Sequence, residues 1–405
     1  MGFSVGIVGK PSCGKTSFTN AACMTEFKVG SYPFTTIEAN VGVAHVRTAC
    51  VCKELDVDDN PQNSICLDGI RLIPIKLIDV AGLVPGAHSG RGMGNQFLDD
   101  LRQADVLIHI VDASGSLDAE GQEVSAGSYD PVEDVRFLEE EITEWMLAII
   151  QKDWRRITGR IRAEGAKLEE LLLEKLSGLK IGRVQILKAL RDSGLKPEGS
   201  DKWSEEDLRL FTLTLQRAAK PIIIAANKID RPTAPANLKR LQEEFPDHLI
   251  VPVSALAEKV LRDLDKKGII KYVPGDTDFT VLDGQKIGEA EMGQLERIRD
   301  EILKALNGTG VQELLNKAVF EFLRLIAVYP VHDVNTLTDS DGNVLPDVYL
   351  VHEGITAKEF AGEIHTDLME SFIHGIDGRT KMKVSDKHEL KDRDVIKIVS
   401  AKGSK

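Results

Sequence analysis

No stretch of the sequence is apolar enough to cross a membrane, since none reaches the roughly 18 consecutive apolar residues that a transmembrane helix requires. The first residues also lack the pattern of a signal peptide, because an apolar strand pattern and a glycine-rich motif follow the first methionine almost at once. We therefore expect a cytoplasmic protein with no membrane partner.

Basic residues are too few for a chain that binds nucleic acid over its whole surface. Lys and Arg number 51 against 64 Asp and Glu, which gives a formal net charge of −13. An acidic protein repels a phosphate backbone unless its positive charge is gathered locally. We therefore expect no DNA partner.

Cysteine is scarce and odd in number, with five residues in 405. This favours free thiols over a disulfide framework. Cys13 lies inside the glycine-rich motif described next, so its oxidation would block that motif. His45, Cys50, Cys52 and Cys66 could together supply four zinc ligands, but their spacing matches none of the common zinc modules.

The first chemically specific motif is G-x-x-x-x-G-K-T at residues 9–16, directly behind the apolar run 5–8. A strand, a glycine-rich loop and a helix in this order form the phosphate-binding loop of nucleoside triphosphatases, whose backbone N–H groups bind phosphate oxygens. Lys15 is expected to neutralise the β- and γ-phosphates as a catalytic residue, and Thr16 to bind Mg²⁺. The alternative is a glycine-rich turn with a solvated lysine. The predicted nucleotide-binding residues here are Gly9, Lys10, Pro11, Ser12, Cys13, Gly14, Lys15, Thr16 and Ser17.

Two later segments carry the pattern of a γ-phosphate switch. The hydroxyl of Thr36, preferred to that of Thr35, could complete the Mg²⁺ shell while a γ-phosphate orders its loop. The alternative there is a turn that enters a strand. An apolar strand then delivers Asp79 to the metal, and Gly82 lets a backbone N–H reach the γ-phosphate. We count Thr36 and Gly82 as catalytic, and Thr16, Thr36 and Asp79 as metal ligands.

Leu83 follows this motif, where many switch GTPases carry a glutamine that orients the attacking water. Leucine cannot form a hydrogen bond to water, so intrinsic hydrolysis should be slow unless another group substitutes. His88 and Arg91 are polar candidates in the glycine-rich loop that follows, although such side chains are more often simply solvated.

The motif N-K-x-D at residues 227–230 ends a buried strand pattern and predicts guanine recognition. The carboxylate of Asp230 can accept hydrogen bonds from N1–H and the exocyclic amine of guanine, a donor pair that adenine lacks. Asn227 and Lys228 belong to the same motif. A further strand and turn would offer backbone N–H groups to the guanine O6. The turn comprises Ser254, Ala255 and Leu256.

The order of motifs predicts an α/β fold with a doubly wound sheet of the P-loop type. The strand pattern at 105–112 is separated by roughly 105 residues from the strand at 221, so the chain carries an insertion. The leucines at 168, 171, 172, 176 and 179 repeat at helical spacing, which predicts an arm of amphipathic helices. We predict a GTPase domain at 1–324 that contains a helical insertion at 114–218.

The C-terminal part predicts a second, smaller domain. Short strand patterns flank one helix that begins near Thr356, and the last strand pattern ends near residue 399. This arrangement is typical of a ubiquitin-like β-grasp domain, which we place at 325–402.

Positive charge is gathered in two places on this acidic chain. Residues 151–202 contain thirteen Lys and Arg against eight Asp and Glu, and residues 379–405 contain nine against four. Two local basic surfaces fit docking onto RNA or a ribosome without general binding. The alternative, that they are solvated helix faces, is nearly as strong for the first stretch.

Together these motifs resemble the YchF-related branch of the Obg-family GTPases over essentially the whole chain. The most specific marks lie at 32–42, 79–87 and 90–98, and the C-terminal marks at 354–361 and 364–367 resemble a TGS domain. The resemblance implies a translation-associated GTPase that docks on the ribosome or RNA through its TGS domain and helical insertion. It also implies that Leu83 replaces the catalytic glutamine.

Two departures from relatives qualify the prediction. Some relatives carry asparagine at the position of Ser12, where it helps to hold an activating K⁺, so K⁺ as a cofactor stays open here. Some YchF relatives have lost N-K-x-D and prefer ATP, whereas this chain keeps it and is expected to use GTP. Three functions remain open: a slow Mg²⁺-dependent GTPase, a nucleotide-gated ribosome-binding module with little hydrolysis, and an ATPase.

Overall fold

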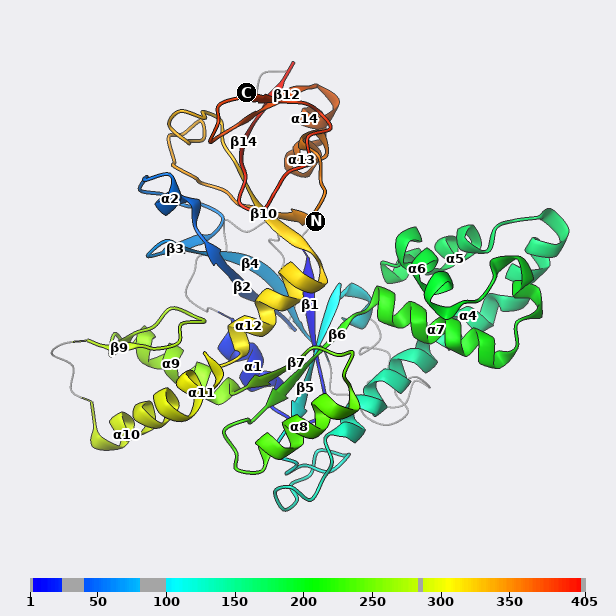
Figure 1. Ribbon diagram of the computed structural model, residues 1–405, viewed down its shortest axis with the longest axis horizontal. Helices are drawn as coiled ribbons and strands as arrows, with labels where there is room; N and C mark the ends of the chain where they lie inside the picture. The colour runs from blue at the N-terminus through cyan, green and yellow to red at the C-terminus, as the bar shows by residue number, and fades with distance from the viewer. Residues whose placement is uncertain (1–2, 24–39, 81–99, 283–286, 402–405) are drawn as a thin grey trace.

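The computed structural model describes residues 3–23, 40–80, 100–282 and 287–401. A central sheet is flanked by helices, a helical arm projects to one side, and a smaller C-terminal domain lies against one end of the sheet (Figure 1). This architecture confirms the predicted α/β fold with a helical insertion and a C-terminal β-grasp domain.

The central sheet has seven strands within the described residues, in the order β2-β4-β1-β5-β6-β7, with β3 paired to β4. Neighbours from β4 to β7 run parallel, while β2 and β3 are antiparallel to β4. The carboxyl ends of the parallel strands therefore meet at one edge, where ligands bind in doubly wound folds. The strands are β1 (Ser4–Val8), β2 (Val41–Ala49), β3 (Ile65–Leu67), β4 (Ile70–Asp79), β5 (Val106–Asp112), β6 (Ile222–Asn227) and β7 (Ile250–Val253).

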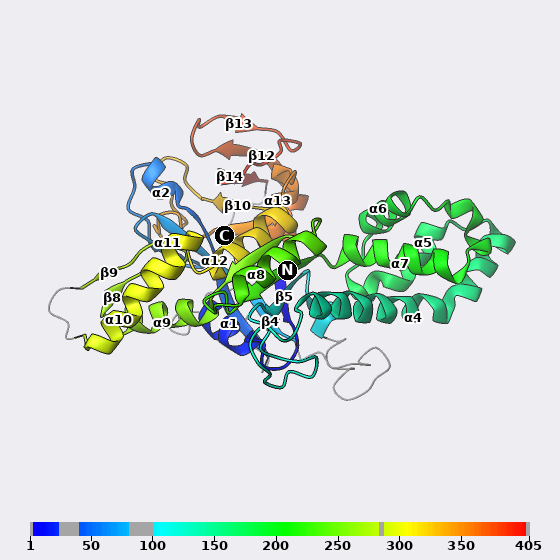
Figure 2. The same cartoon turned by 60° about the horizontal axis from the view of Figure 1, so that its bottom comes forward.

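Alternate residues of these strands belong to different apolar clusters on the two faces of the sheet. Figure 2 shows the helices that surround the sheet. Val5 and Ile7 of β1 join the cluster of Leu314, whereas Val8 joins that of Leu138. Strands covered on both faces read as near-continuous apolar runs, which is why β1, β5 and β6 were legible in the sequence. The helices of the GTPase part outside the arm are α1 (Lys15–Ala22), α2 (Val51–Glu54), α8 (Ala234–Glu244), α9 (Ala255–Lys266), α10 (Glu289–Arg297), α11 (Lys304–Leu306) and α12 (Val311–Asn316).

The last helical segments of the GTPase part include two π-helical stretches, η5 (Ile298–Leu303) and η6 (Lys317–Phe322). A two-stranded hairpin, β8 (Ile270–Lys271) with β9 (Thr280–Val281), packs with η5 in one apolar cluster.

Residues 114–131 of the predicted insertion form turns and an isolated bridge instead of a helix, and the helices of the arm begin with the 33-residue helix α4. The predicted leucine stripe is buried inside the arm, and the side chain of Ser204 caps α7 by accepting from the Asp207 amide at 3.1 Å. The leucines are therefore core residues. The arm comprises α4 (Val132–Glu164), α5 (Leu168–Leu176), η3 (Ser177–Leu179), α6 (Arg183–Ser193), η4 (Pro197–Lys202) and α7 (Glu205–Ala219).

The C-terminal domain has a five-stranded sheet in the order β11-β10-β14-β12-β13 among the described residues. Thr356 caps α13 by accepting from the Glu359 amide at 3.3 Å, as the sequence predicted. The elements are β10 (Leu325–Pro330), β11 (Tyr349–His352), α13 (Ala357–Ile364), α14 (Thr366–Glu370), β12 (Phe372–Asp377), β13 (Lys383–Val384) and β14 (Val395–Ser400).

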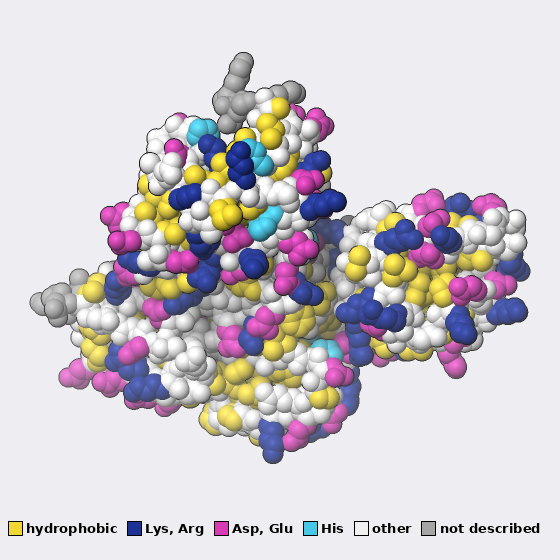
Figure 3. Space-filling model, turned by 45° about the horizontal axis from the view of Figure 1, so that its top comes forward, with side chains coloured by type: hydrophobic (Ala, Val, Ile, Leu, Met, Phe, Trp, Pro, Cys, Tyr) yellow, Lys and Arg dark blue, Asp and Glu magenta, His cyan; other side chains and the backbone are white. Residues whose placement is uncertain are grey.

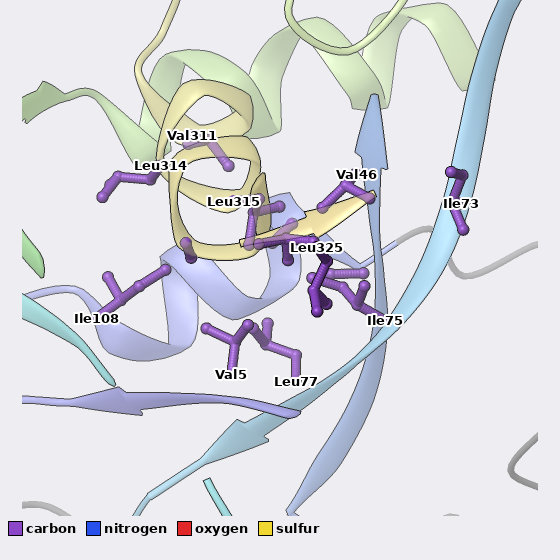
Figure 4. Close-up of a cluster of buried hydrophobic side chains, with 14 of the residues drawn as sticks. Val5, Val46, Ile73, Ile75, Leu77, Ile108, Val311, Leu314, Leu315 and Leu325 are labelled. Atoms are coloured by element: carbon purple, nitrogen blue, oxygen red, sulfur yellow. The ribbon is translucent and has the colours of Figure 1, made fainter. Parts of the chain in front are cut away.

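Strand β10 buries both of its faces, and this joins the two domains. Ile326 and Val328 face α13 in the core of the small domain. Leu325, Ala327 and Tyr329 belong instead to the main GTPase cluster (Figure 4). Because the two domains share one apolar cluster, the small domain is packed against the central sheet rather than tethered to it.

The buried carboxylate of Glu258 fastens α9 to the segments beside it. It has no exposed surface and accepts from Arg262 Nε at 2.6 Å, from the Tyr272 hydroxyl at 2.8 Å and from Thr309 Oγ1 at 2.6 Å. The first turn of α9, which begins after Ser254, therefore contains a buried carboxylate whose charge is balanced by hydrogen bonds.

We expect Glu258→Ala to lower the free energy of unfolding by about 3–5 kcal/mol, because it leaves Arg262 without its buried acceptor. Denaturant unfolding followed by circular dichroism measures this change. The control Glu243→Ala removes an exposed i,i+4 pair with Lys239 and should cost less than about 1 kcal/mol. Equal effects of the two variants would contradict the structural role of Glu258.

Candidate nucleotide-binding site

The phosphate-binding loop connects β1 to α1 at the carboxyl edge of the sheet. Its backbone is held in conformations that suit glycine, since Gly9 has φ +149° and Gly14 has φ +106°. A Cβ on Gly14 would lie 2.3 Å from Nδ2 of Asn227, and one on Gly9 would lie 2.5 Å from the Ile110 carbonyl oxygen. The glycines therefore allow the loop to pack directly against neighbouring strands.

Lys15 is fixed to the loop that it follows. Its ammonium group donates to the carbonyl oxygens of Gly9 at 2.8 Å and Lys10 at 2.9 Å. These contacts hold the positive charge at the amino end of α1, where the helix dipole also favours anions. The arrangement suits the predicted interaction with phosphate oxygens, which stays a prediction.

The hydroxyl and carboxylate predicted to bind Mg²⁺ come from α1 and the end of β4. Thr16 is exposed on the first turn of α1, and Asp79 is half-buried. Burial raises the pKa of Asp79, while the nearby Lys15 charge opposes that shift. Hard oxygen ligands of this kind fit Mg²⁺. Thr36 and Gly82 lie outside the described residues, as do Leu83, His88 and Arg91.

Asn227 connects the phosphate-binding loop to the turn at the start of α9. Its Nδ2 donates to the Cys13 carbonyl at 3.0 Å, and its Oδ1 accepts from the Ala255 amide at 3.2 Å. The Ser254 amide is also engaged, by the Thr309 carbonyl at 2.9 Å. A guanine O6 would therefore share the Ala255 N–H or use that of Leu256.

Asp230 is held in place by the same turn. The hydroxyl of Ser254 donates to its Oδ1 at 2.9 Å and accepts from the Ala257 amide at 3.3 Å, so it both orients the carboxylate and caps α9. The other carboxylate oxygen of Asp230, Oδ2, lies 3.8 Å from Nε of Arg231. The carboxylate keeps the acceptor capacity that two guanine donors require.

One residue beside the predicted guanine motif, Asp112, was missed in the sequence. Asp112, at the end of β5, accepts from Lys228 Nζ at 3.0 Å and from Ser114 Oγ at 2.5 Å. Burial opposes ionisation, but the hydrogen bonds from Ser114 and Lys228 lower the pKa of Asp112 below its usual value. The signal was present, since a carboxylate at the end of a central strand reaches this edge of the sheet.

Lys10 also behaves differently from a phosphate ligand. Its side chain lies 5% exposed with Nζ 2.9 Å from Asp134 of α4, 3.0 Å from the Leu117 carbonyl and 3.9 Å from the centroid of the Tyr129 ring. Because the ammonium group of Lys10 is engaged within the protein, only the backbone of Lys10 can take the predicted role in nucleotide binding. The ion pair connects the phosphate-binding loop to the first helix of the arm.

These features define the class of protein: a P-loop protein with an N-K-x-D motif whose side chains are held by hydrogen bonds, a helical insertion and a C-terminal β-grasp domain. The model of the 50S ribosome-binding GTPase family matches residues 4–146. The model described as Obg-like GTPase YGR210-like, G4 motif-containing domain, matches 225–333, and the TGS domain model matches 336–400.

Whole-chain comparisons identify the family. An uncharacterized GTP-binding protein of Methanocaldococcus jannaschii is 49% identical over 397 residues, covering 98% of this chain and 99% of that one. The crystal structure of a GTP-binding protein from Pyrococcus horikoshii superposes with a TM-score of 0.78 at 38% identity, covering 98% and 100%. The ribosome-binding ATPase YchF of Mycoplasma genitalium is 29% identical over 91% of this chain and 87% of its own. The chain belongs to the YchF family of GTP-binding proteins, which confirms the resemblance found in its motifs.

We expect Asp230→Asn to weaken GDP binding by more than about 100-fold, because an amide cannot accept both guanine donors. The same variant should gain affinity for xanthosine diphosphate, whose C2 carbonyl can accept from the new amide while N1–H donates to its oxygen. Titration with fluorescent nucleotides measures both. The exposed Asp247→Asn is the control, and unchanged GDP affinity in the Asp230 variant would show that this carboxylate does not contact the base.

The buried ion pair of Lys10 and Asp134 should contribute to both folding stability and GDP affinity. Asp134→Ala leaves the ammonium group buried without its carboxylate, so it should lower the free energy of unfolding by about 3–5 kcal/mol. GDP affinity should fall as well, because the loop that carries Lys10 loses its support. The double variant Lys10→Met with Asp134→Leu fills the space without charge and should restore both unfolding stability and GDP affinity. Failure of the double variant to recover either quantity would argue against a role through this pair.

Proposed function

We propose that this GTP-binding protein slowly hydrolyses GTP to GDP and phosphate with Mg²⁺, and that its nucleotide state controls docking on the ribosome in the cytoplasm. Lys15 neutralises phosphate charge, Thr16, Thr36 and Asp79 hold the metal, and the Gly82 amide senses the γ-phosphate. Water attacks directly, and Leu83 gives it no hydrogen bond. A polar group from the ribosome would then accelerate a slow intrinsic reaction.

The observation that supports the proposal is the set of hydrogen bonds around Asp230 and Asn227. The carboxylate of Asp230 is oriented by Ser254, and Asn227 ties that turn to Cys13 of the phosphate-binding loop. In the proposed site, the segment that recognises the base and the loop that binds the phosphates would therefore be joined by one set of contacts. An adenine would leave the partly buried Asp230 carboxylate without its two donors, which disfavours ATP.

Two surfaces support docking on a ribosome. On the small domain, the exposed Lys383, Lys387 and Lys391 lie in the same region of the chain as Ile373 and Met382, which are 57% and 67% exposed. Figure 3 shows basic and apolar side chains together on this domain. Positive charge with exposed apolar side chains suits contact with ribosomal RNA and protein.

The arm offers a second surface. Val184 and Leu187 of α6 are 77% and 46% exposed, and Lys188 lies beside them in the sequence. Many other cations of the arm are already in ion pairs, such as Arg160 with Glu174 and Lys180 with Asp105. The small domain is therefore the stronger candidate for electrostatic docking.

The first experiment compares GTP and ATP hydrolysis by the full chain, with and without purified ribosomes, in K⁺ and in Na⁺ buffers. We expect weak GTP turnover that rises on ribosomes and exceeds ATP turnover. Lys15→Ala should abolish the reaction and is the control for contaminating enzymes. Preferential hydrolysis of ATP would contradict the proposal that Asp230 selects guanine. GTP turnover that is unchanged by ribosomes would contradict the proposal that the ribosome is the activating partner. Faster turnover in K⁺ than in Na⁺ would show a role for K⁺ despite Ser12.

Docking is better tested by surface variants than by truncation, because removing β10 would expose the shared apolar cluster. We expect the triple change of Lys383, Lys387 and Lys391 to Glu to weaken ribosome binding by more than about tenfold and to reduce its salt dependence. The control changes three exposed lysines of the GTPase part, Lys239, Lys267 and Lys304, to Glu. Equal losses would mean that net charge, and not the small domain, determines binding.

A further inference from the structure

Residues 50–66 form an excursion between β2 and β4 that ends in the short strand β3. The excursion contains α2 and a polar stretch, Asp56 to Asn63, with little apolar surface to bury. Cys50 and Cys52 lie at its start and are 3% exposed. Such a segment has few apolar contacts to fix its shape, and three of the five cysteines of the chain lie in it.

Four potential metal ligands converge inside this excursion. One ligand atom from each of Cys50, Cys52, Asp59 and Cys66 lies within 4.8 Å of all the others. Sγ of Cys50 lies 3.2 Å from Oδ2 of Asp59, and Sγ of Cys52 lies 3.8 Å from Sγ of Cys66. Every cysteine of the cluster is a free thiol.

These two distances are close to the ligand-to-ligand distances of a tetrahedral zinc site. With Zn–S bonds of about 2.3 Å, two sulfur ligands at the tetrahedral angle are separated by roughly 3.8 Å. A sulfur and an oxygen ligand are separated by roughly 3.5 Å, so the contact between Cys50 and Asp59 needs to open by only a few tenths of an ångström. The thiols are thus arranged for a central ion.

We propose that Cys50, Cys52, Asp59 and Cys66 bind one structural zinc ion in this excursion. Each of the three thiols releases its proton to solvent as its sulfur binds the metal, and the carboxylate binds as the anion, so no redox change is involved. Three soft thiolates favour zinc over the hard cations that bind oxygen. The set closes the coordination sphere, as structural zinc sites do, and leaves no position for a substrate.

A buried arginine completes the surroundings that such a site requires. Arg71 has no exposed surface, and it lies 3.0 Å from Oδ2 of Asp59 while donating to Ser64 Oγ at 2.9 Å. Ligating carboxylates are usually held by such outer contacts. Its positive charge also offsets part of the negative charge of three thiolates and a carboxylate around one divalent ion.

The same arginine connects the cluster to the small domain. Its Nη2, which pairs with Asp59, also donates to the Leu345 carbonyl at 3.0 Å. Nearby, Asn60 and Val344 exchange two hydrogen bonds, and the Gln62 amide donates to the Pro346 carbonyl at 2.7 Å. A zinc ion would therefore stabilise the conformation in which the excursion forms these hydrogen bonds with the small domain.

His45, which the sequence offered as a fourth ligand, is not part of the cluster. It lies on β2 opposite Pro74, and burial lowers the pKa of its imidazole to about 3. Asp59 takes its place, because its Oδ2 lies 3.2 Å from Sγ of Cys50. The ligand spacing of 50, 52, 59 and 66 follows from this fold and from no familiar motif.

The test uses the full-length, reduced and tag-free protein, stripped with a chelator and then titrated with Zn²⁺ or Co²⁺. We expect one equivalent of metal per chain by mass spectrometry of the elements. The Co²⁺ form should show thiolate-to-metal charge-transfer bands and the intense visible bands of tetrahedral coordination. Absence of these bands in the unmodified protein, or less than a tenth of an equivalent of bound metal, would overturn the proposal.

Variants locate the site. Cys52→Ser and Cys66→Ser should each weaken zinc binding by more than about 100-fold, whereas Cys23→Ser, outside the cluster, should leave it unchanged. GDP binding, which is expected at the opposite, carboxyl edge of the sheet, shows that each variant is folded. Equal losses in the Cys23 variant, or a Cys52–Cys66 disulfide in the mass of the protein purified without reductant or chelator, would overturn the assignment.

Discussion

The side-chain amide of Asn227 is the contact on which the nucleotide site depends. It donates to the phosphate-binding loop at the Cys13 carbonyl and accepts from the Ala255 amide at the start of α9. Gly14 must lack a side chain because this amide occupies the space that a Cβ would need. Without Asn227, the phosphate-binding loop and the turn beside Asp230 would lose the side chain that joins them. Around it, Lys228 with Asp112 and Ser254 with Asp230 fix the remaining side chains.

Both appendages are connected to this site by buried contacts. The arm is joined through Lys10 of the phosphate-binding loop and Asp134 of α4, an ion pair whose two side chains are 5% and 8% exposed. The small domain is joined through β10, whose alternate residues enter two different cores. Ion pairs with little exposure tolerate few arrangements, because any loss of geometry leaves a desolvated charge. The position of each appendage is therefore determined by the GTPase core.

The sequence predicted the elements whose signals are local and missed those that depend on distant partners. The strand and loop at 5–16, the capped helix after Ser204 and the β-grasp helix after Thr356 each follow from a few neighbouring residues. The partners of Lys10 did not, because Leu117, Tyr129 and Asp134 lie more than 100 residues away.

The same limit applied to the cysteine cluster. Spacing alone placed His45 near the thiols, but the strand register of β2 carries the imidazole away from them. A carboxylate from a polar stretch lies beside the sulfurs instead, and composition gives no sign of that fold. The phosphate and guanine motifs were legible because adjacent residues form them, whereas Asp112 and Asp134 contribute through packing between segments.

The pairing of Lys10 with α4 has a mechanical consequence. Asp134 is the third residue of a 33-residue helix, so the far end of α4 lies about 45 Å away at 1.5 Å per residue. A rotation of about 5° at the paired end would displace the tip of the arm by roughly 4 Å, since an α-helix of this length moves as a stiff rod. A small rotation of α4 at its paired end would therefore produce its largest displacement at the tip of the arm. The arm is thus attached to the GTPase core next to the phosphate-binding loop.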